Sequence, residues 1–385
     1  MGGVVHRRIP LNARFIEHMD RCLTCRACEA VCPNQVAYGN LIDQTRAMIA
    51  DSVGAAGKSR QSTLRSFLIR VFINRPKRLE SWRRLFYWGQ KYLGLTFTRI
   101  AALRYLSRYR MLTFIAQLPE VVFPYWRSDG TRHHMGDHWQ SIYPATGEVR
   151  GSVGLFLGCV ARITDAETLN SSIFVLNRLG YTVYVPPDQV CCGAIHQHDG
   201  ALMQAEMLAR RNQAAFAALD IDVAISTASG CGVQLRESGG ASERIAIMDI
   251  SEFLVTAEGW QNLTIEPLQQ EVLVHEPCTL RNVFRSQRYP YQLLARIPGV
   301  QAVPLVGNDQ CCGAAGTYFI DQPELANRLR DAKLALLSES ETQYLVTSNI
   351  GCAMHLIAGL AEKTSKIRVM HPVALLARQM GFAIR

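Results

Sequence analysis

The sequence contains no apolar run of the roughly 18 residues that a membrane-spanning helix needs, so we expect no transmembrane segment. It also lacks a Gly-x-Gly-x-x-Gly fingerprint after an expected strand, which argues against a dinucleotide-binding domain on this chain. No serine, cysteine or carboxylate arrangement indicates hydrolysis. With 385 residues and no signal-peptide pattern, the chain is unlike the small secreted domains that disulfides hold together.

None of the twelve cysteines lies outside three groups. The first group, the ferredoxin run, has the spacing C-x2-C-x2-C-x3-C-P, and we call the two later groups set one and set two. The members are Cys22, Cys25, Cys28 and Cys32 in the ferredoxin run, Cys159, Cys191, Cys192 and Cys231 in set one, and Cys278, Cys311, Cys312 and Cys352 in set two. Thiolates in such groups favour iron–sulfur clusters, so the sequence predicts a redox protein that carries electrons. For the two later sets zinc remains an alternative.

The ferredoxin run predicts a [4Fe–4S] cluster held by Cys22, Cys25 and Cys28. In two-cluster domains the cysteine at the place of Cys32 binds the other cluster, and this sequence shows no second run. Cys32 could turn back to the same cluster, a partner could supply the fourth ligand, or the cluster could keep an open position.

Composition and hydrophobic patterning divide the chain into five expected segments. These are a ferredoxin-type helical domain over 1–57 with a helix over 38–50, a helical basic segment over 58–123, a linker over 124–150 rich in glycine and proline, and two cysteine-rich repeats over 151–265 and 266–385.

Set two repeats the arrangement of set one. Cys278, Cys311 and Cys352 follow their counterparts by 119, 120 and 121 residues, which predicts an internal duplication. Short apolar runs predict a strand before each cysteine: 153–157, 181–185 and 223–226, then 272–275, 303–306 and 344–347. Because helical stretches such as 166–179 alternate with them, we expect a multidomain α/β protein whose two parallel half-domains are related by a pseudo-two-fold axis. The ligands should then lie at the carboxyl ends of the strands.

Three histidines are candidates for a further ligand or for a supporting role. His355 lies three residues after Cys352, about one helical turn, and could bind a metal or pack beside one. His275, shortly before Cys278, and His198, shortly after Gly193, could tune a cluster or carry protons, although packing roles are favoured for both.

Positive charge is concentrated between Lys58 and Arg110, where fourteen lysines or arginines accompany one acidic residue, Glu80. Aromatic side chains alternate with basic ones such as Arg83, Arg84, Arg108 and Arg110. We expect this segment to contact an anionic membrane surface or an acidic partner, with a solvated helical surface as the alternative. Nucleic-acid binding is not expected, because no recognition module accompanies the charge.

The chain resembles the iron–sulfur subunit family of glycolate oxidase, which is related to lactate-utilisation and heterodisulfide-reductase B-type proteins. The matching motifs lie at 20–28, 158–159, 191–194, 227–232, 275–280, 311–318 and 349–352. The resemblance implies an electron-transfer subunit that receives electrons from a flavoprotein and passes them to a quinone or another carrier. The flavoprotein would carry FAD and oxidise glycolate or D-lactate. It also implies a cytoplasmic protein, with the inner face of the cell membrane as an expected peripheral location. We identify no catalytic residue on this chain.

Two departures from the family qualify this reading. Family members usually carry two ferredoxin runs, and this chain keeps what resembles the second. Each repeat of the heterodisulfide-reductase branch often ends in C-x2-C, whereas here Gln234 and His355 stand in place of the last cysteine. The missing cysteines count against a cluster of the heterodisulfide-reductase type and favour the glycolate-oxidase type. A thiol- or disulfide-reducing subunit is the alternative enzyme function, and a zinc-stabilised scaffold is the non-enzymatic alternative.

Overall fold

The computed structural model of the protein describes residues 1–5, 8–54, 80, 83, 87, 138–239, 244–335, 337 and 342–382. Most of the expected basic segment, and the linker up to residue 137, lie outside the described residues. Within the described part of the chain, no helix has the length and apolar character that crossing a membrane would require.

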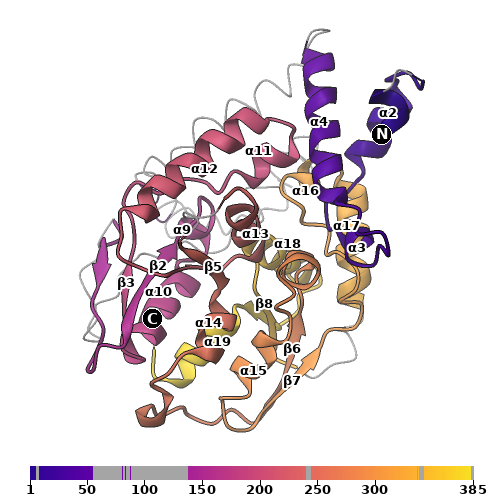
Figure 1. The fold of residues 1–385 in the computed structure, drawn as a ribbon. Helices are drawn as coiled ribbons and strands as arrows, with labels where there is room; N and C mark the ends of the chain where they lie inside the picture. Colours follow the sequence, from indigo (N-terminus) through magenta and orange to yellow (C-terminus); the bar gives the residue numbers. More distant parts are fainter. Residues whose placement is uncertain are drawn as a thin grey trace.

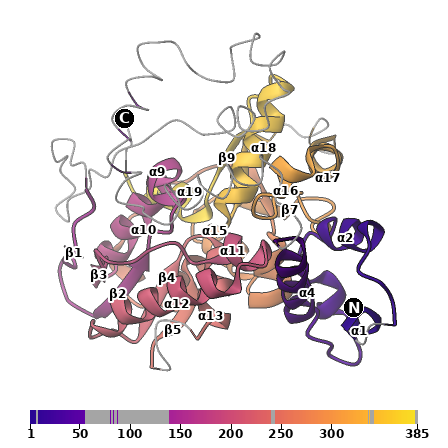
Figure 2. The ribbon, with the colours of Figure 1, turned by 90° about the horizontal axis from the view of Figure 1, so that it is seen from above.

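The ferredoxin run lies in a small helical region at the N-terminus. Its helices are α1 (Gly2–Val5), α2 (Ala13–Asp20), α3 (Ala27–Ala30) and α4 (Tyr38–Gly54). The side chain of Asn12 caps α2 by accepting a 2.9 Å hydrogen bond from the amide of Phe15, as asparagine commonly does before a first helical turn. The helix predicted over 38–50 is confirmed and runs four residues further. Helices α2 and α4 stand together at one edge of the molecule (Figures 1 and 2).

Two sheets follow, and the four parallel strands of each have the same order. Sheet one contains β1 (Ile142–Tyr143), β2 (Gly151–Phe156), β3 (Tyr181–Tyr184), β4 (Val223–Ser226) and β5 (Ala246–Asp249), in the order β1-β3-β2-β4-β5. Sheet two contains β6 (Gln270–His275), β7 (Val300–Pro304), β8 (Tyr344–Thr347) and β9 (Arg368–Met370), in the order β7-β6-β8-β9. In each sheet the first parallel strand lies between the second and the third. The expected duplicated α/β fold is therefore confirmed.

The strand predicted over 303–306 is wrong in its bounds. Strand β7 spans Val300–Pro304 because its backbone pairs in parallel register with β6, from Gln270 opposite Val300 to Val274 opposite Pro304. Strands β1, β5 and β9 were not predicted, and each is short and lies at a sheet edge. Strand β1 falls within the segment expected as a linker and pairs antiparallel with β3.

Helices connect the strands of both repeats. The first repeat contains α9 (Ala161–Thr164), α10 (Ala166–Arg178), α11 (Ala194–His198), α12 (Leu202–Ala217), α13 (Ser229–Glu237), α14 (Ile250–Thr256) and the short η2 (Trp260–Asn262). The second contains η3 (Leu280–Phe284), α15 (Tyr289–Leu294), α16 (Tyr318–Asp321), α17 (Pro323–Ala335), α18 (Ile350–Glu362) and α19 (Pro372–Gln379).

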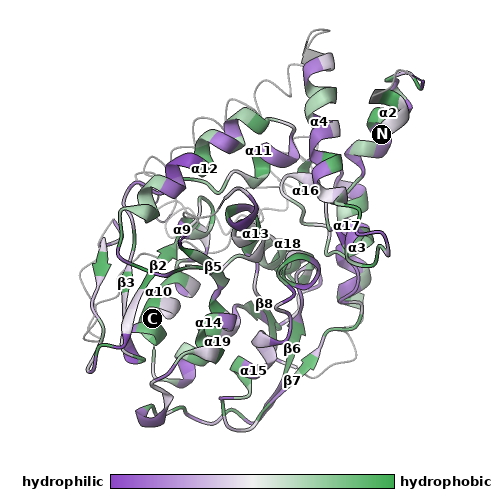
Figure 3. Cartoon of the chain, viewed as in Figure 1, coloured by the Kyte–Doolittle hydropathy of each residue, from purple (hydrophilic) through white to green (hydrophobic). Residues whose placement is uncertain are grey.

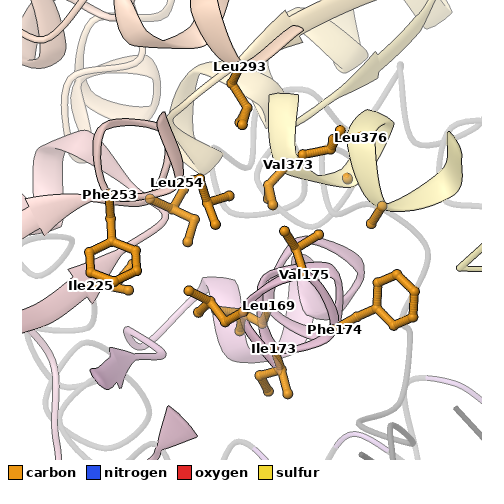
Figure 4. Packing of buried hydrophobic residues seen from close by; sticks show 14 of the residues in the cluster. Leu169, Ile173, Phe174, Val175, Ile225, Phe253, Leu254, Leu293, Val373 and Leu376 are labelled. Atoms are coloured by element: carbon orange, nitrogen blue, oxygen red, sulfur yellow. The ribbon is translucent and has the colours of Figure 1, made fainter. Parts of the chain in front are cut away.

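A single apolar core joins the two repeats. Leu155 and Val183 of sheet one share this core with Val272 and Val274 of sheet two. Helices α10, α14, α15 and α19 fill the space between the sheets, where α10 packs on α19 and α14 packs on α15 (Figure 4). Because α10 corresponds to α15 and α14 to α19, these two contacts are equivalent by the pseudo-two-fold symmetry.

The outer faces of the sheets have separate cores. Phe156, Leu208 and Phe216 pack between sheet one and helices such as α12, while Leu273 and Leu334 pack on the outer face of sheet two. Helix α12 shows hydrophilic and hydrophobic residues around its circumference, as expected for a helix with one buried face (Figure 3). The strands are covered on both sides, which explains their nearly continuous apolar sequences.

The shared core predicts a stability effect. Replacing Ile173, which lies on α10 and is fully buried, by alanine should lower the free energy of unfolding by about 2–5 kcal/mol, because a cavity remains between the repeats. Chemical denaturation followed by circular dichroism measures this loss. Met203→Ala, on the exposed side of α12 at 84% exposure, is the control and should change it by no more than about 0.5 kcal/mol. Equal effects of the two substitutions would contradict the shared core.

Candidate metal centres

The structure brings the four sulfur atoms of set two together at the carboxyl end of sheet two. Cys278 follows β6, Cys311 and Cys312 lie in the loop between β7 and α16, and Cys352 lies in the first turn of α18. The Sγ atoms of Cys312 and Cys352 are 3.1 Å apart. The thiol of Cys311 is hydrogen-bonded to those of both Cys278 and Cys312, so the four sulfurs form one continuous group.

Set one repeats this geometry at sheet one. Hydrogen bonds between thiols link Cys159 to Cys191, Cys191 to Cys192, and Cys192 to Cys231. Cys159 follows β2, and Cys231 lies in the first turn of α13 after β4. Because β2 and β4 are the first and third strands of their repeat, set one lies at the point where the strand order reverses, where open α/β sheets bind their ligands.

The donor chemistry of both sets suits a metal centre. The pKa of Cys278 is raised, mainly by its hydrogen bond with Cys311 and also by burial. The pKa of Cys159 is raised in the same way, mainly by its hydrogen bond with Cys191 and also by burial. In each set three cysteines are buried and one is half-buried. Four thiolates so close together repel one another unless a cation or an iron–sulfur core compensates their charge. Thiolate groups of this kind hold iron–sulfur clusters or zinc, so the residues present fit such a group.

Backbone amides also point at the sulfurs. The amide of Gly193 donates to the Sγ atom of Cys191 at 3.5 Å, and the amide of Gly313 donates to that of Cys311 at 3.4 Å. Cys231 and Cys352 lie at helix N-termini, where the helix dipole favours negative charge. Both features stabilise thiolate in preference to thiol.

The adjacent cysteines depend on the glycine that follows them. Gly313 has φ of +89°, and a Cβ atom there would lie 2.5 Å from the carbonyl oxygen of Ala326 on α17. Gly193 has φ of +94°, and a Cβ atom there would lie 3.2 Å from the carbonyl oxygen of Ala205 on α12. Both glycines therefore supply the left-handed backbone that the turn requires, and their close approach to the next helix is an additional reason for them.

The ferredoxin run is held by its own helices. The amide of Thr24 donates to the Sγ atom of Cys22 at 3.5 Å, and the hydroxyl of Tyr38 on α4 hydrogen-bonds the same thiol. Arg46 of α4 donates to the carbonyl of Cys22 at 2.7 Å and to that of Met19 at 3.0 Å. Cys28 is exposed, and Cys22, Cys25 and Cys32 are half-buried.

The ferredoxin run packs directly against the surroundings of set two. Asn282, which follows Cys278 on η3, donates from Nδ2 to the carbonyl of Cys25 at 2.8 Å. Burial is the main cause that raises the pKa of Cys25, and a backbone hydrogen bond opposes it. Negative charge on Cys278 also raises this pKa, so the two thiols lie within electrostatic range of each other. The contact therefore brings a ferredoxin-run sulfur within electrostatic range of a set-two sulfur.

Tyr318 makes a second link between the two groups. Its hydroxyl donates to the carbonyl of Arg21 at 3.1 Å, next to Cys22. Burial raises the pKa of Tyr318, and charges on Cys22 and Cys311 add to that shift, so its ring lies near a sulfur of each group. Neither Asn282 nor Tyr318 was a site candidate in the sequence, although Tyr318 ends the motif at 311–318.

The first repeat anchors the other side of the ferredoxin region. Arg46 donates to the carbonyl of His198 at 3.2 Å, and Nδ1 of His198 lies 3.3 Å from Oδ1 of Asp43 on α4. Arg26 forms an ion pair with Glu237 at the end of α13. His198, a candidate for cluster tuning, thus contributes to the contact between α4 and α11.

The two remaining histidines have different surroundings. A ring nitrogen of His275 lies within 4.8 Å of the Sγ atoms of Cys312 and Cys352, and its Nδ1 is 2.9 Å from the hydroxyl of Thr347. Burial and the charge of Lys333 lower the pKa of His275 to about 3, so the ring is neutral and able to bind a metal. Nε2 of His355 instead donates to the carbonyl of Ala326 at 3.1 Å.

Two residues of the basic segment, Glu80 and Arg83, are buried beside the first repeat. Arg83 is 1% exposed and donates to the carbonyl of Arg162 on α9 at 2.7 Å. Glu80 forms a buried 3.1 Å ion pair with Arg162, three residues after Cys159. The expectation that Arg83 belongs to an exposed docking surface is therefore wrong, because its guanidinium completes a contact inside the protein.

Comparisons with known proteins agree with this geometry. A family model described as "Cysteine-rich domain" matches residues 153–236 and 272–357, which hold the two sets. The chain is 31% identical to a "Probable glycolate oxidase iron-sulfur subunit" of Bacillus subtilis, over 94% of this chain and 82% of that protein. It is 29% identical to the "Glycolate oxidase iron-sulfur subunit" of Escherichia coli, over 91% and 79%. A "Lactate utilization protein A" of Bacillus velezensis is 26% identical, over 57% and 96%.

The glycine turn yields a prediction about set two. Gly313→Ala should remove the centre at set two, because the new Cβ meets the carbonyl of Ala326 and the backbone must leave its left-handed conformation. Iron or zinc per chain, measured on anaerobically purified protein, should fall. Gly316→Ala is the matched control: its φ is +55°, but no atom lies within 4 Å of the added Cβ, so metal content should be retained. Equal loss in both variants would contradict the role of the close approach.

The contacts of Arg46 yield a prediction about the ferredoxin run. Arg46→Met removes donors to three carbonyls, each worth about 1.5–3 kcal/mol as a hydrogen bond from a charged group. Iron from the ferredoxin run should then be lost to a chelator sooner than in the parent protein, followed as decay of its EPR signal. Arg21→Met, which removes an exposed i,i+4 ion pair with Glu17, should leave the rate unchanged. If Arg46→Met decays no faster than the parent, Arg46 does not hold the run in place.

Proposed function

Since the chain belongs to the family of glycolate oxidase iron–sulfur subunits, we propose that it transfers electrons within a complex that oxidises a 2-hydroxy acid, glycolate or D-lactate. In this proposal a partner flavoprotein carries FAD and binds the substrate. The present chain receives the electrons and passes them to a quinone or another carrier.

The contact between the ferredoxin run and set two is the observation that carries the proposal. Iron–sulfur clusters supply one-electron transfer, and an electron moves between two of them only when they lie close together. Asn282 and Tyr318 hold the two cysteine groups against each other through the carbonyls of Cys25 and Arg21. A zinc scaffold would gain nothing from this arrangement, whereas an electron-transfer subunit requires it.

The residues that would hold each centre are part of the proposal. The sequence spacing supports a [4Fe–4S] cluster held by Cys22, Cys25 and Cys28, with Cys32 as a candidate fourth ligand. Set one and set two each offer four thiolates for an iron–sulfur centre, and His275 is a further candidate ligand at set two. Six of the eight sulfurs of sets one and two are buried, which excludes water, while the exposed Cys28 leaves one edge of the ferredoxin run open to a partner.

Docking to a membrane surface or an acidic partner remains part of the proposal. The positive charge between Lys58 and Arg110 supports it, with Arg83 excluded because it is buried. Arg84, Arg108 and Arg110 lie outside the described residues. We propose that these three arginines contribute to the docking surface. The affinity of docking should fall as added salt screens their charge.

Reconstitution with the flavoprotein tests the function. The isolated, flavin-free chain should not reduce a dye with glycolate or D-lactate, and the flavoprotein of the same complex should reduce its iron–sulfur centres when substrate is present. Cys25→Ser should abolish the EPR signal of the ferredoxin run in that assay. Substrate turnover by the isolated chain, or a chain that binds zinc and no iron, would contradict the proposal.

A further inference from the structure

Helices α12 and α17 occupy corresponding places beside set one and set two. Each presents a buried stripe to its own sheet, and the stripe of α17 continues past the end of that helix to Leu337, two residues after Ala335. The members, each separated from its counterpart by 121 residues, are Ala205, Ala209, Asn212 and Phe216 in the first repeat and Ala326, Arg330, Lys333 and Leu337 in the second. The backbones of Ala205 and Ala326 are also the ones that the two turn glycines approach. Asn212 and Lys333 therefore occupy equivalent positions in the two repeats. The first side chain is neutral, and the second carries a positive charge.

Asn212 supports set one without adding charge. It is fully buried, accepts the amide hydrogen of Val190 at 2.8 Å and donates to the carbonyl of Cys191 at 3.0 Å. Its amide thereby uses an acceptor and a donor to fix the backbone just before and at the first of the adjacent cysteines. The position is satisfied by neutral hydrogen bonds.

Lys333 brings a cation to the same place at set two. Its side chain is 2% exposed, and its Nζ donates to the carbonyl of Gly307 in the loop before Cys311. Burial lowers the pKa of Lys333, and the charges of Cys312, Cys311 and Cys352 oppose that shift. Its positive charge also acts on His275, so the ammonium group lies within electrostatic reach of both the sulfurs and the histidine of set two.

Two other buried cations near the sets form ion pairs with carboxylates. Arg330 pairs with Glu362 and with Asp331, each at 2.8 Å. Arg162, near Cys159, pairs with Glu80 at 3.1 Å, and the buried Arg83 donates to the carbonyl of Arg162. Among the described residues no carboxylate forms an ion pair with Lys333, although the charge of Asp309 reaches it. The charge of Lys333 therefore lies near set two without a direct counterion, and in a buried site such a charge acts strongly.

A second difference between the two sets also favours negative charge at set two. His275, at the end of β6, corresponds to Phe156 at the end of β2, so set two has an imidazole where set one has an apolar ring. A polar ring beside an anionic centre stabilises added negative charge better than a phenyl ring, because its dipole can orient toward the centre.

From these differences we propose that Lys333 raises the reduction potential of set two above that of set one, so that an electron reaching the ferredoxin run is drawn to set two. The inference rests on the proposed function, because it requires iron–sulfur centres at these sets. Reduction adds one electron, and with it one negative charge, to the centre and makes or breaks no bond with Lys333. A fixed cation nearby favours the reduced form, as second-shell charge and hydrogen bonding do in iron–sulfur sites generally.

Redox titration of the full chain, poised with dithionite and followed by EPR, tests the assignment. The signal that disappears in Cys312→Ser identifies set two, and the signal that disappears in Cys192→Ser identifies set one. In Lys333→Met the reduced-to-oxidised ratio of set two, at a fixed solution potential, should fall at least about tenfold, equivalent to about 59 mV for one electron. Set one should not shift.

Two matched variants separate charge from packing. Lys333→Arg keeps the charge and should retain the parent potential, whereas Arg328→Met removes an exposed charge from the same helix and should leave it unchanged because solvent screens that site. Iron content reports whether each variant still holds its centres. If Lys333→Met loses iron, Lys333→Gln, a shorter neutral donor, takes its place in the comparison.

The outcomes distinguish this inference from the proposed function. An unchanged set-two potential in the neutral variants, with the EPR signal intact, overturns the role of Lys333 and leaves the electron-transfer function standing. An iron content and EPR spectrum that do not change in Cys312→Ser would show that set two holds no reducible centre. That result would overturn the inference and would remove set two from the electron path of the proposed function.

Discussion

Four sulfur atoms, linked one to the next and largely buried at the carboxyl ends of three parallel strands, impose the constraint on which most of this structure depends. Burial raises the cost of ionising a thiol, and close approach adds repulsion among the thiolates. The protein compensates with amide hydrogens from Gly193 and Gly313 and with the N-termini of α13 and α18. The adjacent cysteines can share one centre only because a left-handed glycine turns the chain immediately after them. A bound cationic or iron–sulfur core completes this compensation.

Because the repeat is duplicated, the protein contains two such sulfur groups, set one and set two. The shared core holds the two repeats in a fixed orientation relative to each other. Helices α10 and α19, and their equivalents α15 and α14, pack between the sheets, so neither repeat can turn without opening that core. The ferredoxin run then breaks the symmetry. It contacts the first repeat through Arg46 and Asp43 of α4, but its Cys25 thiol lies within electrostatic range of Cys278 of set two. Two sites of common origin thus occupy different positions relative to the ferredoxin run.

The sequence predicted much of this arrangement, and the failures have physical causes. The cysteine spacing and its recurrence predicted the duplicated α/β fold, because adjacent cysteines followed by glycine at a fixed offset have few structural solutions. The bounds of β7 were wrong because strand pairing, which the local apolar pattern does not report, decides where a strand ends. His355 is on the same helical face as Cys352, yet its ring binds the carbonyl of Ala326 on a neighbouring helix. Lys333 lies far from any cysteine in the sequence, and only the packing of α17 shows it beside set two.

The central claim is that the ferredoxin run and set two form a directly coupled pair of redox centres. Pulsed EPR of the fully reduced protein measures this, because two paramagnetic centres in close contact broaden each other's signals and shorten each other's relaxation times. The account predicts that the ferredoxin-run signal loses this broadening in Cys312→Ser and keeps it in Cys192→Ser. A ferredoxin-run signal that relaxes at the same rate in the parent protein and in Cys312→Ser would contradict it.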